Sequence, residues 1–135
     1  MMTEPSPSIP NPDGPWRSPM RIVIGTDGST AARAALAWVA QLPLGADDII
    51  TIAAAAQRPV PHDTWGYDRT PSTVEIEQTM WRQAHEAARR AVAAAASTIE
   101  HLPCAVDLVV EEGHPIDVLG RVALESKADL LVVGP

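Results

Sequence analysis

The residues best suited to bind a ligand lie in the segment Gly25–Ser29, which reads GTDGS and follows a short apolar run. Asp27 could accept hydrogen bonds from an amine or hydroxyl group of a ligand, or could coordinate a metal ion. Gly28 would allow the backbone to turn with a positive φ. The same residues could instead form a simple turn in which Ser29 caps the following helix. The segment is neither a Walker loop nor a G-x-G-x-x-G fingerprint, so it predicts neither of these phosphate-binding mechanisms.

A second polar segment, Gly113-His114-Pro115, stands at the predicted start of a helix. Asp117 follows in the first turn, where the helix dipole favours a carboxylate. The simplest interpretation of His114 is a solvent-facing loop residue. The four histidines and the single cysteine do not have the spacing of zinc ligands, so we expect no metal site. No G-x-S-x-G motif marks a nucleophilic serine, and we expect the protein to act by binding rather than as an enzyme.

Four apolar runs and three amphipathic segments would position these groups. Short, continuously apolar strands that alternate with amphipathic helices predict right-handed crossovers and a parallel sheet covered on both faces. The predicted fold class is therefore α/β, with a doubly wound parallel sheet. The predicted strands are residues 21–25, 49–54, 105–111 and 129–133, and the predicted helices are residues 30–42, 73–101 and 115–127.

The longest predicted helix, residues 73–101, follows a proline-containing loop at residues 57–72. Trp65 and Tyr67 in this loop could close over a base, although packing of the loop on its own rings is the simpler interpretation. The spacing of apolar residues predicts the stripe of the helix that faces the sheet, namely Ile76, Met80, Ala84, Ala87, Ala91 and Ala95.

The composition indicates one globular domain with an acidic surface, because the 135 residues are 46% hydrophobic and carry a net charge of -7. No Lys/Arg cluster is visible, which argues against nucleic-acid binding. Arg89 and Arg90 lie at helical spacing from Glu86 and predict a solvated ion pair. The lone Cys104 is predicted to be a small buried residue near a strand start, and a single cysteine fits a reducing compartment.

The N-terminal segment, residues 1–19, is rich in proline and serine and predicts a disordered tail ahead of a domain at residues 20–135. It has no cationic start and no apolar run, so it does not read as a signal peptide. No stretch of the sequence is apolar enough for a membrane span. We therefore expect a cytoplasmic protein without membrane contact.

Two segments of the sequence resemble the universal stress protein family: RIVIGTDGSTAARAALAWVA at residues 21–40 and EEGHPIDVLGRVALESKADLLVVG at residues 111–134. In the second, Gly113, Pro115 and Leu119 have the family's Gly-x-Pro-x-x-x-Leu spacing. The resemblance covers essentially the whole chain after the N-terminal tail. It implies a stress-response protein with a flavodoxin-like (Rossmann-like) sheet of strand order 3-2-1-4-5. In many members, an ATP site lies over the switch point between the first and fourth strands.

The resemblance also implies a set of binding residues. By position, Asp27 matches the family's adenosine-contacting aspartate, Ala54 matches the second-strand residue that meets adenine, and Gly134 matches the first glycine of the phosphate loop Gly-x-x-Gly-x9-Gly-Ser/Thr. The sequence stops at Pro135, where the family usually has serine, so the rest of this loop and the fifth strand would be missing. We therefore expect an impaired ATP site, with ATP binding no more tightly than adenosine and both binding weakly.

Without a fifth strand, the fourth strand would be a bare apolar edge that invites pairing with another chain. Such pairing would give a homodimer or a complex with a partner protein, and the chain would then act as an interaction module. A further alternative is a nucleotide-transferring enzyme of the related α/β fold. That enzyme would need a phosphate-contacting motif, and we find none in the sequence.

Overall fold

The computed structural model describes residues 19–57 and 71–134. Strands and helices alternate along the chain as the sequence predicts. The elements are β1 (Arg21–Gly25), α1 (Thr30–Val39), β2 (Ile49–Ala56), α2 (Pro71–Thr98), β3 (Ala105–Glu112), α3 (Pro115–Glu125) and β4 (Leu130–Val132).

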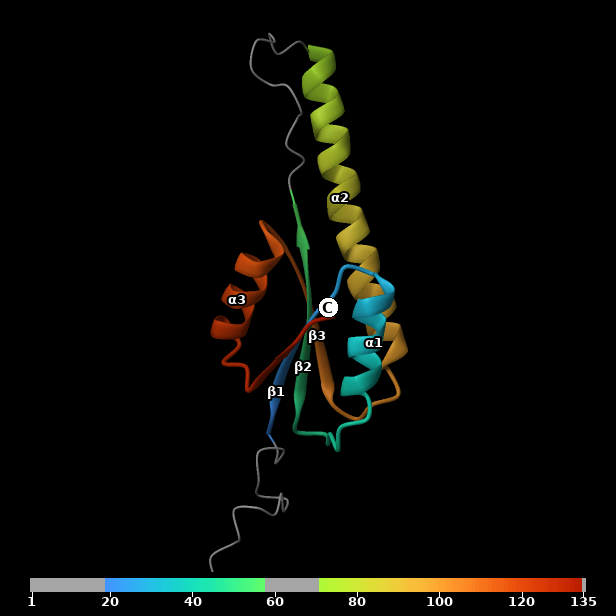
Figure 1. Cartoon of the computed structure of the whole chain (residues 1–135), viewed down its shortest axis with the longest axis vertical. Coiled ribbons are helices and arrows are strands. Elements are labelled where there is room, and N and C mark those ends of the chain that lie inside the picture. Colours follow the sequence, from blue (N-terminus) through green and yellow to red (C-terminus); the bar gives the residue numbers. More distant parts are fainter. Residues whose placement is uncertain (1–18, 58–70, 135) are drawn as a thin grey trace, which may run out of the picture.

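The strands form one parallel sheet of four strands in the order β3-β2-β1-β4 (Figure 1). In the central strand, Ile22 is in register with Ile50 of β2 on one side and Leu130 of β4 on the other. The predicted doubly wound sheet and its order 3-2-1-4 are confirmed. The strand order reverses direction at β1, so the switch point of the sheet lies between β1 and β4.

Helices cover both faces of this sheet, with α1 and α2 on one side and α3 on the other (Figure 1). Ile24 and Ile52 point toward α1 and α2, where they join a buried cluster with Leu36. The intervening residues point the opposite way: Val23 packs in a second cluster beneath α3. Burial on both faces explains why the two central strands, β1 and β2, show continuous apolar runs instead of alternating polar residues.

The first helix forms as the sequence predicts. Ser29 is its N-cap, and its Oγ accepts a hydrogen bond from the Ala32 N–H at 3.1 Å. Ala32, Leu36 and Val39 are buried against the sheet, whereas the neighbouring Ala35 is half-buried. The apolar stripe therefore determines how α1 lies on the sheet.

The stripe predicted for α2 is wrong at three of its six positions, where the side chains are exposed. Ile76 and Met80 are 59% and 45% exposed, because the first half of α2 extends past the carboxyl ends of the strands (Figure 1). In the second half, the sheet-facing residues are Ala88, Val92 and Ala95. Alanines lie on several sides of this helix, and they do not define one apolar face. Of the six residues predicted to face the sheet, Ala95 is buried, Ala84 and Ala91 are half-buried, and Ala87 is exposed.

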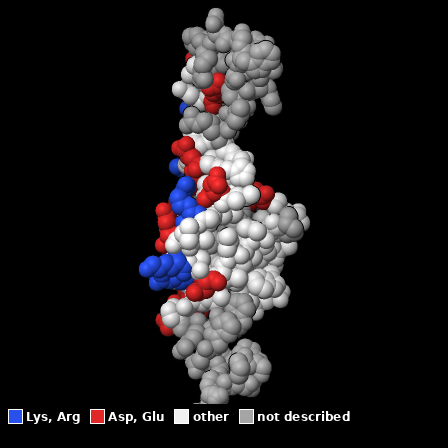
Figure 2. All heavy atoms as spheres, turned by 60° about the vertical axis from the view of Figure 1, so that its left-hand side comes forward, with Lys and Arg blue, Asp and Glu red and all other residues white. Residues whose placement is uncertain are grey.

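Charged side chains of both signs lie intermixed on the face shown in Figure 2, next to a broad area without charge. Arg90 and Glu86 form an i, i+4 ion pair at 3.6 Å with both side chains about 70% exposed, which confirms the predicted solvated pair. Cys104 is buried as predicted. No helix in the described part of the chain has the length and apolarity needed to cross a membrane.

Several predictions fall outside the described residues. They concern the N-terminal tail up to residue 18 and most of the loop that contains Trp65 and Tyr67.

Candidate functional site

A cleft of about 520 Å³ lies at the carboxyl ends of β1, β2 and β4, at the switch point of the sheet. Its sides come from the loop after β1, the first turns of α3 and the end of β4. In open parallel sheets, ligands bind at this position, and pockets for small molecules have volumes of about 300–1,000 Å³. The cleft is therefore the candidate ligand site.

The loop after β1 brings Asp27 into this cleft. The Thr26 N–H donates to the Ala53 carbonyl of β2 at 2.9 Å, which extends the strand pairing into the loop. Gly28 then turns the chain with φ of +82°, a conformation that favours glycine. The Ser29 N–H donates to Asp27 Oδ1 at 2.9 Å. Asp27 therefore shapes the turn, as the simpler interpretation of the sequence predicts, and its side chain also lines the cleft.

The carboxyl group of Asp27 is ionised at neutral pH. Hydrogen bonds from the Ser29 side chain and then from its backbone lower the pKa of Asp27, and the residue is exposed. An exposed, ionised carboxylate accepts hydrogen bonds and cannot donate them. Asp27 can therefore bind hydroxyl or amino groups of a ligand.

The second predicted site residue, Ala54, does not line the cleft. Its side chain is 2% exposed and lies in the cluster beneath α1 and α2. Its neighbours Ala53 and Ala55 point to the opposite face of the sheet and line the cleft. Because side chains alternate along a strand, the burial of Ile52 and Ala54 on one face fixes the two adjacent alanines on the other.

The third predicted site residue, Gly134, lies in the cleft directly against the first turn of α1. A Cβ atom at this position would lie 2.5 Å from the backbone C and O atoms of Ala31, closer than real Cβ contacts. Glycine at this position therefore allows the end of β4 to approach the start of α1. This packing requirement is independent of the phosphate-binding role that the resemblance implies.

The start of α3 forms the apolar side of the cleft. His114 caps the helix, with its Nδ1 accepting a hydrogen bond from the Ile116 N–H at 3.2 Å, and Pro115 begins the first turn. Ile116, Leu119 and Pro115 line the cleft, and Ile116 is 74% exposed. His114 is exposed to solvent, as expected, and in addition serves as the helix cap.

The apolar residues of the cleft were missed by the sequence analysis. Ile116, Leu119, Leu131 and Val133 have the helical and strand spacing of core residues, and nothing in the sequence distinguishes them from residues that face the interior. An apolar cleft at a sheet edge uses the same residue types as the core. Only the packing of α3 and β4 shows that these four side chains line a cleft.

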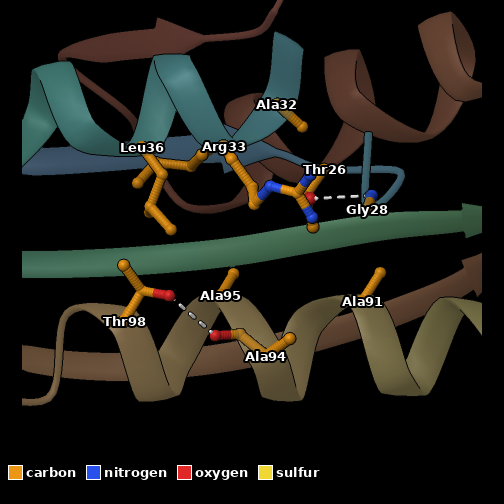
Figure 3. A pocket seen from close by; sticks show the side chains of 10 residues that line it. Thr26, Gly28, Ala32, Arg33, Leu36, Ala91, Ala94, Ala95 and Thr98 are labelled. Atoms are coloured by element: carbon orange, nitrogen blue, oxygen red, sulfur yellow. Dashed lines mark hydrogen bonds between the residues drawn. The ribbon is translucent and has the colours of Figure 1, made fainter. Parts of the chain in front are cut away.

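A second, smaller cavity of about 60 Å³ lies between α1 and α2, behind the loop that carries Asp27 (Figure 3). Thr26 and Ala32 line both spaces, so the loop separates them. Arg33 extends from α1 across this cavity toward Thr26 (Figure 3). Its Nη2 donates a hydrogen bond to the Thr30 hydroxyl at 3.3 Å. The cavity has room for a few water molecules at most and is too small for a nucleotide.

No metal-binding group is found in the described part of the chain, where no three His, Cys, Asp or Glu side chains come together. The residues that line the main cleft include one ionisable side chain, Asp27. Within the described lining, the candidate site is therefore a largely apolar cleft with one ionisable acceptor, Asp27, beside the hydroxyl groups of Thr26 and Ser29.

A doubly wound parallel sheet with an apolar cleft at its switch point defines an α/β domain with a candidate ligand site. The model of the universal stress protein family matches residues 19–135. Universal stress protein Rv1636 of Mycobacterium tuberculosis H37Rv is 35% identical over 120 residues, which cover 84% of this chain and 73% of the relative. The chain belongs to the universal stress protein family.

Solved structures show the same fold. A universal stress protein family structure from Burkholderia pseudomallei has a TM-score of 0.63 and 27% identity, with 87% of this chain and 82% of that chain covered. An Arabidopsis thaliana family protein, At3g01520, was solved with AMP bound. It has a TM-score of 0.60 at 13% identity, and the match covers 87% of this chain and 77% of that one. At that identity the likeness concerns the fold alone.

Proposed function

We propose that this protein acts in the stress response by binding an adenine nucleoside or nucleotide in the switch-point cleft, without turning it over. The observation that carries the proposal is the pairing of an ionised acceptor, Asp27, with apolar side chains in one cleft. Ribose hydroxyls and the adenine amino group are donors that a carboxylate binds, and a purine ring is flat and largely apolar. The volume of the cleft suits a ligand of nucleoside size.

Membership of the universal stress protein family supports this choice of ligand class. The AMP bound to the Arabidopsis thaliana protein is a property of that protein, and it makes AMP a sensible first ligand to test here.

Binding without catalysis is part of the proposal. General acid–base chemistry needs a second titratable group or a nucleophile activated by a base. Among the described residues that line the cleft, Asp27 is the one titratable side chain, and the Ser29 hydroxyl already accepts the Ala32 N–H as a helix cap. These features support a binding role over the nucleotide-transferring alternative.

Impaired binding of ATP also belongs to the proposal. A triphosphate is usually held by Lys or Arg side chains or by a glycine-rich loop of backbone N–H groups. The described lining of the cleft contains no Lys or Arg. We expect ATP to bind no more tightly than adenosine.

Isothermal calorimetry with adenosine on the purified chain tests the proposed function. Asp27→Ala should weaken adenosine binding at least tenfold, because a hydrogen bond to a charged group contributes about 1.5–3 kcal/mol. The matched control is Asp47→Ala, an exposed aspartate at the opposite, amino-terminal end of β2, which should bind adenosine like the wild type. Equal affinity of the wild type and Asp27→Ala would refute the assignment of the cleft.

A second candidate function, an interaction module, is favoured by the contrast between the two edges of the sheet. At the β3 edge, the strand carries three carboxylates, Asp107, Glu111 and Glu112, which discourage pairing with another strand. At the β4 edge, Leu130–Val132 carries no charge, and within the described residues this strand pairs on one side only. We propose that the free side of β4 pairs with a strand of a second copy.

Sedimentation velocity over a range of protein concentrations tests this pairing. Leu131→Lys places a charge on β4 and should shift the protein toward monomer. The control is Leu108→Lys on β3. The two leucine side chains have similar exposed fractions, 48% for Leu108 and 42% for Leu131. Leu108→Lys should associate like the wild type. A wild-type protein that stays monomeric at high concentration contradicts the proposal.

A further inference from the structure

The first half of α2 presents large apolar side chains to solvent. Ile76 and Met80 are 59% and 45% exposed, and they lie one turn apart on the same side of the helix. This part of α2 extends past the carboxyl ends of the strands, so the sheet does not cover it (Figure 1). Apolar residues aligned along one side of an exposed helix are typical of a surface that packs against another helix.

The same side of α2 continues into the second half of the helix with small residues. Ala87 lies two turns after Met80, and Ala91 lies one turn after Ala87. Ala87 is exposed and Ala91 is half-buried. We call the side formed by Ile76, Met80, Ala87 and Ala91 the α2 seam. The seam therefore has large side chains at one end and small side chains at the other.

The small cavity between α1 and α2 lies at the small end of the α2 seam. Ala91 and Ala94 of α2 line it together with Leu36 of α1, and its volume is about 60 Å³ (Figure 3). Its lining is mostly aliphatic. The cavity can therefore receive the end of one aliphatic side chain.

The two ends of the α2 seam also differ in charge. Glu75 and Glu77 flank the large end, whereas Arg90 stands next to the small end. The Arg90 side chain stays exposed although it pairs with Glu86 at 3.6 Å. Arg33 of α1 adds a second positive charge, since it extends across the small cavity (Figure 3). The large end is therefore acidic and the small end is basic.

We propose that two copies of this chain associate by packing their α2 seams against each other in antiparallel orientation. A two-fold axis at the middle of the seam places Met80 opposite Ala87 of the second copy, and Ile76 opposite Ala91 of the second copy. Each large side chain then packs on a small one, which allows the two helices to approach closely. At both ends of the interface, the isoleucine of one copy lies next to the small cavity of the other.

The charges on α2 favour the antiparallel orientation. In this orientation Glu75 lies near Arg90 of the second copy, and the two-fold axis repeats the contact. A parallel orientation would bring the two Glu75 side chains together, and like charges repel. The association uses neither the ligand cleft nor the edge strand β4, so it is independent of the proposed function.

Sedimentation velocity of the full chain over a range of concentrations measures the dissociation constant of the dimer. Ile76→Glu should raise this constant about tenfold or more, because the change enters a symmetric interface twice. The matched control is Leu124→Glu. Leu124 is an 81% exposed apolar residue of α3 that lies outside the seam, and this variant should associate like the wild type. Circular dichroism of each variant reports separately on folding.

An exchange of charges tests the orientation of the two helices. Glu75→Arg and Arg90→Glu should each dimerise more weakly than the wild type, because each variant places like charges at both contacts. An equal mixture of the two variants should form a one-to-one complex, since both contacts then join unlike charges again. The control is Arg89→Glu. It makes the same change of charge about 100° further round the helix, away from the seam, and should associate like the wild type.

The possible outcomes are distinct. A wild-type protein that stays monomeric at high concentration overturns the proposed association. A dimer that survives Ile76→Glu but is lost in Leu131→Lys assigns the contact to β4 and also overturns it. A mixture of Glu75→Arg and Arg90→Glu that associates no better than either variant alone refutes the antiparallel orientation. None of these results depends on adenosine, so the proposed function is tested separately.

Discussion

Asp48 should be one of the most important residues for the stability of this fold. Its side chain is fully buried at the amino-terminal edge of the sheet. Oδ1 accepts the Met20 N–H at 2.7 Å, and Oδ2 accepts the Gly45 N–H at 2.6 Å. The carboxylate thus ties the start of β1 to the loop between α1 and β2. Its removal would leave two backbone N–H groups without these acceptors.

The expected magnitude follows from these two hydrogen bonds. Each bond to a charged group contributes about 1.5–3 kcal/mol, so Asp48→Ala should lower the free energy of unfolding by about 3–6 kcal/mol. That is a large share of the roughly 5–15 kcal/mol typical of a domain, and this variant could fail to fold. Asp48→Asn keeps one acceptor oxygen and should lose roughly half as much.

Urea denaturation followed by circular dichroism measures these changes. Asp47, the preceding residue, is exposed, and Asp47→Asn should change the free energy of unfolding by less than about 0.5 kcal/mol. The variants should have similar m-values, because they expose similar surface on unfolding. If Asp48→Asn is as stable as Asp47→Asn, the reasoning about the buried carboxylate is refuted.

Three further predictions concern single residues. Lys127 follows Ser126, the C-cap of α3, and has φ of +53°. Lys127→Gly should therefore raise the free energy of unfolding by about 1 kcal/mol, and a free energy of unfolding below that of Lys127→Ala would contradict this. Gly120→Ala should stabilise α3 by about 0.5–1 kcal/mol, since a Cβ there meets no atom within 4 Å. Gly134→Ala should destabilise the protein, because its Cβ would lie 2.5 Å from the backbone C and O atoms of Ala31, and urea unfolding should give these opposite signs. Burial raises the pKa of the Cys104 thiol, and the reactive thiolate form is therefore scarce. The rate at which iodoacetamide alkylates Cys104 should be low in the native protein and should rise when urea unfolds it. Rapid alkylation of the native protein would contradict the burial of this thiol.

The sequence by itself determined the order of the elements, and their boundaries to within three residues. The predicted and observed first strands coincide at Arg21–Gly25, and Ser29 caps α1 as the simpler interpretation of its segment predicts. Pro115 begins α3 as predicted. These features depend on local physics: proline restricts its own φ, a serine hydroxyl reaches the N–H three residues later, and continuous apolar runs must be buried on both sides.

Local sequence also brought Asp27 to the carboxyl end of the first strand, where a parallel sheet binds ligands. It could not assign the neighbouring alanines of β2, because Ala53, Ala54 and Ala55 are chemically identical. Their faces depend on the register of β2 with β1 and β3, and that register places Ala54 beneath α1 and α2.

Only the tertiary structure decided which residues of α2 and of the Asp47–Asp48 pair are buried. Alanines surround α2, so its orientation is fixed by larger side chains such as Val92, and its first half has no strands beneath it (Figure 1). Asp47 and Asp48 are adjacent and identical in the sequence, yet Asp48 is buried because the chain brings the N–H groups of Met20 and Gly45 to its carboxylate. A buried carboxylate is tolerated only where such donors converge, and that convergence involves a residue 28 positions away along the chain.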